Sequence, residues 1–250
     1  NDCCLGVVSV DEYETTGGSA FRPATESFQL TGNNNPGNGN LNEVGATWST
    51  NRVDLANNFF IDTELYFGDQ DSDQGGITIS LQNSSNGDTA SSDGQEENLG
   101  VGAITPSFGA YFKTSSSNGE PASDHTGFFE NGVISSVGPS PVPINSENDN
   151  VEDGKWHRVS MEWDSDSQEL KVYYEGELRQ TIQKDIVNDI FGGATEVYLG
   201  VTAGTPEPAE TQLGAKIAEI KTVNEESAIV DMTVRETSSE TFSSDGNAID

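Results

Sequence analysis

The sequence predicts an all-β protein, and three features of it indicate a two-sheet sandwich of antiparallel strands. Hydrophobic and polar side chains alternate with a period of two along much of the chain, which is the pattern of strands that bury one face. The helical period of 3.6 residues is nearly absent. The stretches between the alternating segments are rich in Asn, Gly, Ser and Asp, and strands joined by such long polar loops are typical of a sandwich.

Six segments carry the alternation most clearly, and each predicts a half-buried strand. In residues 59–67, Phe59 and Ile61 fall on one face of an extended chain, while Asp62 and Glu64 fall on the other. The other five segments are residues 77–82, 108–113, 158–163, 170–174 and 197–201.

One short helix is expected, over residues 185–191. Gly192 and Gly193 follow it, and they would end it because glycine adopts the left-handed cap conformation at little cost.

We expect one folded domain, over residues 26–223, between an N-terminal extension at 1–25 and an acidic extension or extra strand at 224–250. Each extension holds a short β-prone segment: Leu5 to Val10 in the first, and alternating Val230, Met232 and Val234 in the second. An exposed sheet edge can accept a strand from the same chain or from a neighbour. Self-association through the terminal strands is therefore one expected mode of assembly. The alternative is that both segments only pad their own sandwich or link it to further domains.

The charge of the chain excludes two classes of partner. Its 250 residues include 11 Lys and Arg against 42 Asp and Glu, for a formal net charge of −31. Such a surface repels phosphate backbones and anionic lipid headgroups, so we expect no binding to nucleic acid. No run of apolar residues approaches the roughly 18 needed to span a bilayer, so we also expect no membrane insertion.

Cys3 and Cys4 are the only cysteines, and they are adjacent. Three states are open to them: a strained vicinal disulfide, a bridge to another chain, or the free thiols usual in a cytosolic protein.

The order and spacing of several short motifs identify the family that the chain resembles. The motifs are Ser27 to Gly32, Val44 to Trp48, Val53 to Leu55, Gly76 to Asn83, Ile104 to Phe108, Asp124 to Gly127, Asp153 to His157, Asp185 to Gly193 and Val197 to Gly200. Together they resemble an L-type (legume-type) lectin domain of the bacterial extracellular kind over roughly residues 26–223. The resemblance implies a concanavalin-A-like jelly roll, glycans as partners, and an extracellular or cell-surface location.

Lectins of this family depend on calcium and manganese, and the resemblance places their metal ligands on positions where this chain differs. The family's Glu-Phe-Asp-Thr strand end corresponds to Tyr111-Phe112-Lys113-Thr114. The Asn, Asp and His that complete the two metal sites correspond to Asn118, Glu120 and His125.

Lys113 is the most consequential of these differences, because it replaces an aspartate and so changes the local charge by two units. Each unit charge about 4 Å from a cation is worth about 4 kcal/mol at an effective dielectric constant of about 20. We expect the Lys113 ammonium to take the place of the ion and to pair with Glu120 or Asp124. The alternative is a rearranged site, with His125 as its best single ligand, that still holds calcium.

The sugar-binding position of the family differs as well. The resemblance matches its orienting aspartate, which precedes a glycine, to Gly75 before Gly76, so that carboxylate is absent. The candidate sugar-contact residues, expected to line a shallow depression, are Asp73, Gly75, Gly76, Asn118, Thr202, Ala203 and Gly204. Asp73 lies in residues 69–75, whose alternate carboxylates suit either a solvated acidic turn or a calcium loop with a misplaced glycine, and it could substitute for the missing aspartate.

We do not expect an enzyme. Glycosidases need two carboxylates about 5–10 Å apart across a cleft, and the nearest approach is Asp62 with Glu64, on a face expected to be solvated. The sequence thus predicts a glycan-recognition or adhesion module with a degenerate metal site. The alternative is a structural subunit of an extracellular filament or surface appendage that has lost sugar binding.

Overall fold

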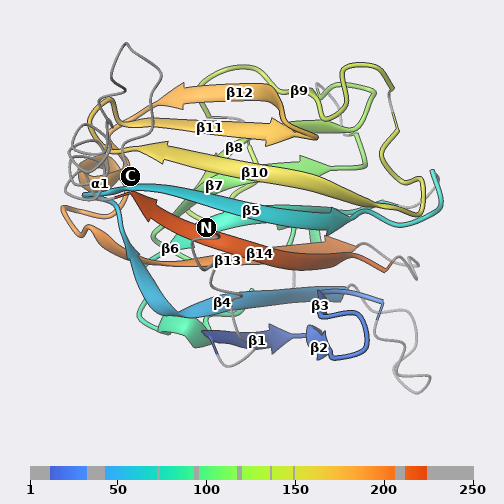
Figure 1. Ribbon diagram of the computed structural model, residues 1–250, viewed down its shortest axis with the longest axis horizontal. Helices are drawn as coiled ribbons and strands as arrows, with labels where there is room; N and C mark the ends of the chain where they lie inside the picture. The colour runs from blue at the N-terminus through green and yellow to red at the C-terminus, as the bar shows by residue number, and fades with distance from the viewer. Residues whose placement is uncertain are drawn as a thin grey trace, which may run out of the picture.

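The computed structural model describes residues 12–32, 43–71, 74–92, 96–116, 120–135, 137–148, 150–205 and 212–223. Over these residues two seven-stranded sheets form a β-sandwich, and every strand pairing is antiparallel (Figure 1). The predicted all-β sandwich is therefore confirmed.

The two sheets interleave segments from the whole described chain. The first sheet has the order β1 (Tyr13–Gly17), β4 (Glu43–Asp54), β13 (Glu196–Thr205), β6 (Gly76–Gln82), β7 (Ser107–Lys113), β8 (His125–Glu130) and β9 (Val142–Pro143). The second has the order β12 (Glu177–Gln183), β11 (Glu169–Tyr174), β10 (Trp156–Asp164), β5 (Asn58–Tyr66), β14 (Gly214–Val223), β3 (Ser27–Gln29) and β2 (Ala20–Arg22). Two 3₁₀ turns, η2 (Gly87–Thr89) and η3 (Glu96–Asn98), and the helix α1 (Ile186–Asp189) complete the described elements.

The main core lies between the sheets and follows the predicted alternation. In β5, Phe59 and Ile61 are buried, whereas Asp62 and Glu64 are half-exposed on the outer face. The indole Nε1 of Trp163 donates a 2.9 Å hydrogen bond to the Leu55 carbonyl, which satisfies its polar atom inside the core.

The outer face of the first sheet is also covered, by the segment between β6 and β7. Every residue of β6 and of β7 is buried for this reason. Two small apolar clusters lie there: Ala46, Trp48, Ala90 and Ile104 form one, and Leu99, Val101, Tyr111 and Phe129 form the other. The Trp48 Nε1 donates to the Ala90 carbonyl at 2.8 Å and ties this covering segment to β4.

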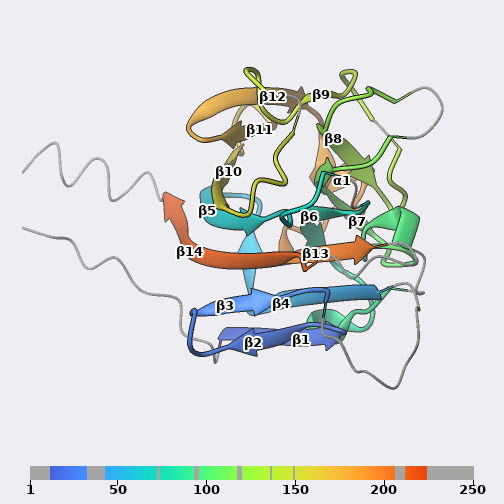
Figure 2. The ribbon, with the colours of Figure 1, turned by 90° about the vertical axis from the view of Figure 1, so that its right-hand side faces the viewer.

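The sandwich begins earlier than the predicted boundary at residue 26. Residues Tyr13–Gly17 and Ala20–Arg22 form edge strands, and in Figure 2 these lie beside β3 and β4 at the lower margin of the sandwich. The reason is aromatic packing: the rings of Tyr13 and Phe28 lie 5.6 Å apart. The predicted segments Leu5 to Val10 and Val230 to Val234, like Cys3 and Cys4, lie outside the described residues.

The predicted short helix is confirmed between β12 and β13. Asp185 caps α1, because its carboxylate accepts the backbone N–H of Asn188 at 3.0 Å. Gly192 and Gly193 follow with φ of 61° and 91°, the left-handed conformation that glycine adopts without strain.

The contact between β13 and Trp48 yields a prediction about stability. A Cβ added to Gly200 would overlap the Trp48 ring and the Thr47 carbonyl oxygen. We expect Gly200→Ala to lower the free energy of unfolding by about 1–3 kcal/mol, as overpacking does. At Gly18 the nearest atom to an added Cβ is 3.5 Å away, so Gly18→Ala should change the free energy of unfolding by less than about 0.5 kcal/mol. Urea unfolding followed by circular dichroism measures both, and equal losses would contradict the expectation.

Candidate functional site

Three loops meet at one end of the sandwich, and we call this region the loop end. They follow β5 (residues 67–71 and 74–75), β7 (114–116 and 120–124) and β9 (144–148 and 150–155). Among the described residues, the hydrogen bonds between these loops include Val151 N to Asp124 Oδ2 at 2.8 Å, Ile144 N to the Asp124 carbonyl at 2.9 Å, Gly154 N to the Gly68 carbonyl at 2.9 Å, Asn150 Nδ2 to Asp71 Oδ1 at 2.7 Å and Thr114 N to the Gly75 carbonyl at 3.0 Å. The protein's own groups therefore hold these loops against one another.

An ion pair lies at the centre of the loop end. Lys113 is the last residue of β7, and its Nζ donates to both carboxylate oxygens of Glu120, at 3.0 and 2.7 Å. The two side chains are 10% and 23% exposed, so water screens the pair only partly. Of the two partners predicted for Lys113, the structure shows Glu120, while the Asp124 carboxylate accepts the Val151 N–H.

Tyr111 precedes Lys113 by two residues and lies on the same side of β7. Its ring is 1% exposed and packs in the apolar cluster with Leu99 and Phe129. The residue opposite it on β8 is Gly127, where a Cβ would lie 2.6 Å from the Tyr111 hydroxyl oxygen, so the ring occupies the space that this glycine leaves. A position that the family resemblance assigns to a metal-binding carboxylate is thus part of an apolar cluster.

His125 lies directly opposite Lys113 in the register of β7 and β8, and it is completely buried. Its Nδ1 is 3.0 Å from the Ser123 carbonyl oxygen, and its ring meets the Tyr111 ring edge-on at 5.9 Å. Burial, helped by the positive charge of Lys113, lowers the pKa of His125 despite the opposing influence of Ser123 and Glu120. The neutral ring donates Nδ1–H to Ser123, and its Nε2 has no hydrogen-bond partner among the described residues.

The predicted sugar-contact residues come together only in part. Gly76 pairs with Gly204 on one side and with Lys113 on the other, so three strands bring these positions side by side. Thr202 and Ala203, however, are fully buried, and the Thr202 hydroxyl donates to the Leu99 carbonyl at 2.7 Å.

The covering segment therefore fills the depression that was expected above Thr202, Ala203 and Gly204. The resemblance could not reveal this, because the covering segment comes from residues distant in the chain. Gly75 is buried as well, and the remaining two candidates, Asp73 and Asn118, lie outside the described residues.

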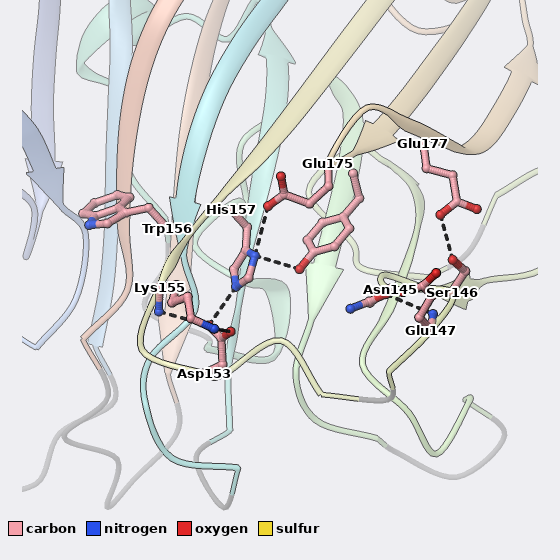
Figure 3. A pocket seen from close by; sticks show the side chains of 10 residues that line it. Asn145, Ser146, Glu147, Asp153, Lys155, Trp156, His157, Glu175 and Glu177 are labelled. Carbon is pink, nitrogen blue, oxygen red and sulfur yellow. Dashed lines mark hydrogen bonds and ion pairs between the residues drawn. The ribbon is translucent and has the colours of Figure 1, made fainter.

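A polar pocket of about 390 Å³ opens on the second-sheet side of the loop end (Figure 3). His157 lies in it between two carboxylates: its Nε2 is 3.0 Å from Asp153 Oδ1, and its Nδ1 is 3.1 Å from Glu175 Oε1. The Tyr174 hydroxyl oxygen is 2.8 Å from the same Nδ1. Figure 3 shows the turn that carries Asn145 and the neighbouring Ser146 facing this group across the hollow.

The pocket is acidic, and most of its charges are paired within it. Burial alone would raise the pKa of Asp153, but hydrogen bonds from Lys155 and His157 outweigh it and hold that pKa below its ordinary value. Burial and the nearby Glu175 raise the pKa of Tyr174, which therefore keeps its proton. Anionic ligands are disfavoured here, and neutral or cationic polar groups are favoured.

Sequence reasoning missed this pocket because its residues belong to separate segments. The available signals were weak: Asp153 and His157 are four residues apart, and Glu175 precedes Gly176 in a tight turn. The indole of Trp156 points away from His157 in Figure 3, and the Nζ of Lys216 lies 4.3 Å from its ring centroid. Trp156 therefore offers no free stacking platform inside the pocket.

Comparison with known proteins identifies the family. The family model described as the legume lectin beta-barrel domain matches residues 8–213, so the chain belongs to the L-type lectin family. It is a lectin-like module built on the fold that the sequence predicts.

Solved structures support the same fold at low sequence identity. Peanut lectin, solved with a 9mer peptide, is 18% identical with a TM-score of 0.62, over 88% of this chain and 97% of its own. Arcelin-5, a lectin-like defense protein from Phaseolus vulgaris, is 13% identical with a TM-score of 0.63, over 86% and 94%. The carbohydrate recognition domain of Emp46p, in a potassium-bound form, is 15% identical with a TM-score of 0.57, over 87% and 93%.

The residues of the loop end do not fit the calcium and manganese pair of the family. Calcium takes six to eight oxygen ligands, and an ammonium offers none. Two of the ligand positions that the resemblance assigns are occupied by the Lys113 ammonium, which pairs with Glu120, and by the Tyr111 phenol, which lies in an apolar cluster. Across the described ranges, no group of three or more His, Cys, Asp or Glu side chains is arranged to hold a metal ion.

The burial of the ion pair predicts how its partners respond to substitution. Glu120→Gln leaves the more deeply buried ammonium without its carboxylate and should lower the free energy of unfolding by about 2–3 kcal/mol. This loss is somewhat smaller than the loss expected when a fully buried ion pair is broken. Lys113→Met leaves the better hydrated carboxylate and should cost about 1 kcal/mol. Urea unfolding of the single variants and of the double variant forms a thermodynamic cycle. Additive losses would show that the pair contributes no coupling energy.

Proposed function

We propose that this chain is an extracellular glycan-recognition or adhesion module that binds saccharide without calcium or manganese. The observation that carries the proposal is the Lys113–Glu120 ion pair at the loop end of an L-type lectin sandwich. The ion pair holds the loop after β7, and the hydrogen bonds of Asp124 and Gly68 link the three loops, so a binding surface can be presented without an ion.

The chemistry of the loop end indicates which saccharides suit it. Gly75 supplies no orienting carboxylate, so affinity must come from other polar groups and from backbone donors. We expect weak binding, in the millimolar range, which corresponds to about −4 kcal/mol. The carboxylates of Asp153, Glu175 and Glu177 around the pocket disfavour uronic and sialic acids and favour neutral or amino sugars.

The structure supports binding rather than catalysis. Burial alone would raise the pKa of Asp62, but hydrogen bonds from Arg158 and Ser160 outweigh it and keep this carboxyl ionised. Glu64 pairs with Lys216 at 2.8 Å. Neither carboxyl is arranged as the proton donor that a glycosidase requires.

An extracellular or cell-surface location is part of the proposal and rests on the family. The described part of the chain contains no helix long and apolar enough to cross a bilayer.

A glycan array probed with and without chelator tests this function. We expect the same neutral or amino-sugar glycans to be bound in EDTA and in excess calcium and manganese, because Lys113 supplies the positive charge at the loop end. A metal-dependent legume lectin on the same array is the control and should lose its signal in EDTA. Loss of binding by this chain in EDTA would contradict metal independence, and absence of binding in both conditions would contradict glycan recognition.

One observation favours a second candidate, a structural subunit of an extracellular filament or surface appendage. Among the described residues, β14 pairs with β5 over its whole length but with β3 only at Gly214 and Ala215. Ile217 and Ile220 in the remainder of β14 are half-buried at the margin of the core. An edge of this kind can accept a strand from another molecule.

The assembly of the whole chain tests the second candidate. If terminal strands join neighbouring chains and Cys3 or Cys4 locks the junction, the native chain should sediment as an assembly under oxidising conditions. Removal of residues 1–12 should then convert it to monomers. A native chain that remains monomeric at high concentration under these conditions would rule the candidate out.

A further inference from the structure

We infer that Lys113 is a built-in substitute for the metal ions of the family, and that it blocks a latent metal site of which Glu120 and His125 are the surviving ligands. The inference is independent of whether the domain binds a glycan, because it concerns only the cation at the loop end. It rests on three observations about β7, β8 and the loop between them.

The first observation is the way in which the ammonium holds its partner. The Lys113 Nζ contacts both oxygens of Glu120, so one positive charge bridges the carboxylate as a cation would. The side chain of Lys113 is only 10% exposed, whereas that of the surface lysine Lys155 is 73% exposed and extends into water. A lysine buried to this degree needs a compensating anion, and Glu120 supplies it.

The second observation is the state of His125. Histidines that bind a metal usually donate their other ring N–H to a carbonyl or carboxylate, which fixes the tautomer and aims the free nitrogen at the ion. His125 has this arrangement: Nδ1 faces the Ser123 carbonyl, and the fully buried Nε2 has no hydrogen-bond partner among the described residues. A buried nitrogen left without a partner costs free energy, so packing alone does not favour it.

The third observation is the register that brings the positions together. Lys113 lies opposite His125, and Tyr111 shares its side of β7. Carboxylates at positions 111 and 113 would therefore join Glu120 and His125 at one corner of the sheet. Three carboxylates and one imidazole form a donor set suited to manganese, and without an ion their like charges would repel one another.

The main experiment compares three forms of the full chain: wild type, the double variant Tyr111→Glu with Lys113→Asp, and the control Lys221→Asp. The control makes the same charge change as Lys113→Asp at an exposed lysine of β14, away from the loop end. Thermal unfolding in EDTA and in excess manganese chloride measures the stabilisation by metal, and electron paramagnetic resonance counts bound manganese.

We expect manganese to raise the melting temperature of the double variant by on the order of 5 °C, with a bound ion detected by resonance. The wild type and Lys221→Asp should bind none, and their melting temperatures should respond equally to the salt. A double variant that folds in EDTA and binds no manganese would overturn the latent site. A wild type that binds manganese at this position, with loss on His125→Asn, would overturn the substitution by Lys113.

Chemical rescue decides the matter if the double variant does not fold. Lys113→Ala removes the ammonium and leaves room beside Glu120, so ethylammonium chloride should restore part of the lost melting temperature. Sodium chloride at equal ionic strength is the control for general screening of the acidic chain, and Lys155→Ala is the control for the site. Equal effects of the two salts on Lys113→Ala would show that the ammonium has no specific role and would overturn the inference.

Discussion

A nearly buried ammonium requires a carboxylate within contact distance, and this requirement determines how the loop end of the domain is organised. Lys113 ends β7 and binds Glu120 in the loop that leads to β8. Four residues later, the Asp124 carboxylate accepts the backbone N–H of Val151, which lies in the loop after β9. In that loop the N–H of Gly154 donates to the Gly68 carbonyl of the loop after β5. One charge pair thus stands at the start of a series of contacts that connects all three loops. Its cost is the desolvation of Lys113, which the two short bonds to Glu120 offset.

A second constraint, the covering of the first sheet on both faces, explains why the sugar-contact residues lie where they do. A strand buried on both sides has no exposed face from which small residues could line a depression. Thr202 therefore uses its hydroxyl inside the protein, on Leu99 and on Thr78 at 2.7 Å. The polar pocket instead lies at the end of the second sheet, where the strands β10, β11 and β12 meet the loops. The polar groups of this pocket come from the ends of β10, β11 and β12 and from the loop after β9.

The sequence was sufficient for the fold because β5, β10 and β11 bury one face each and show this as a period of two. For the ion pair it left two partners open, because Glu120 and Asp124 both lie in the loop that follows Lys113, and the structure shows the pair with Glu120. The early strand at Tyr13 was missed because the segment Tyr13–Gly17 shows little alternation of its own and is held by the aromatic ring of Phe28. The pocket around His157 was missed because it depends on long-range pairing, which no local pattern encodes.

These observations together explain what the chain gains by supplying its own cation. A bound metal stabilises a folded loop only in proportion to its concentration relative to its dissociation constant, and it is lost where the ion is scarce. A lysine is part of the chain and is therefore present at one equivalent under every condition, and its pairing with Glu120 needs no ion from solution. The replacement of an ion by Lys113 also removes the site from competition among metal ions. The chain's net charge of −31 would otherwise attract such ions without selecting one. A recognition surface built in this way depends on the sequence alone for its shape.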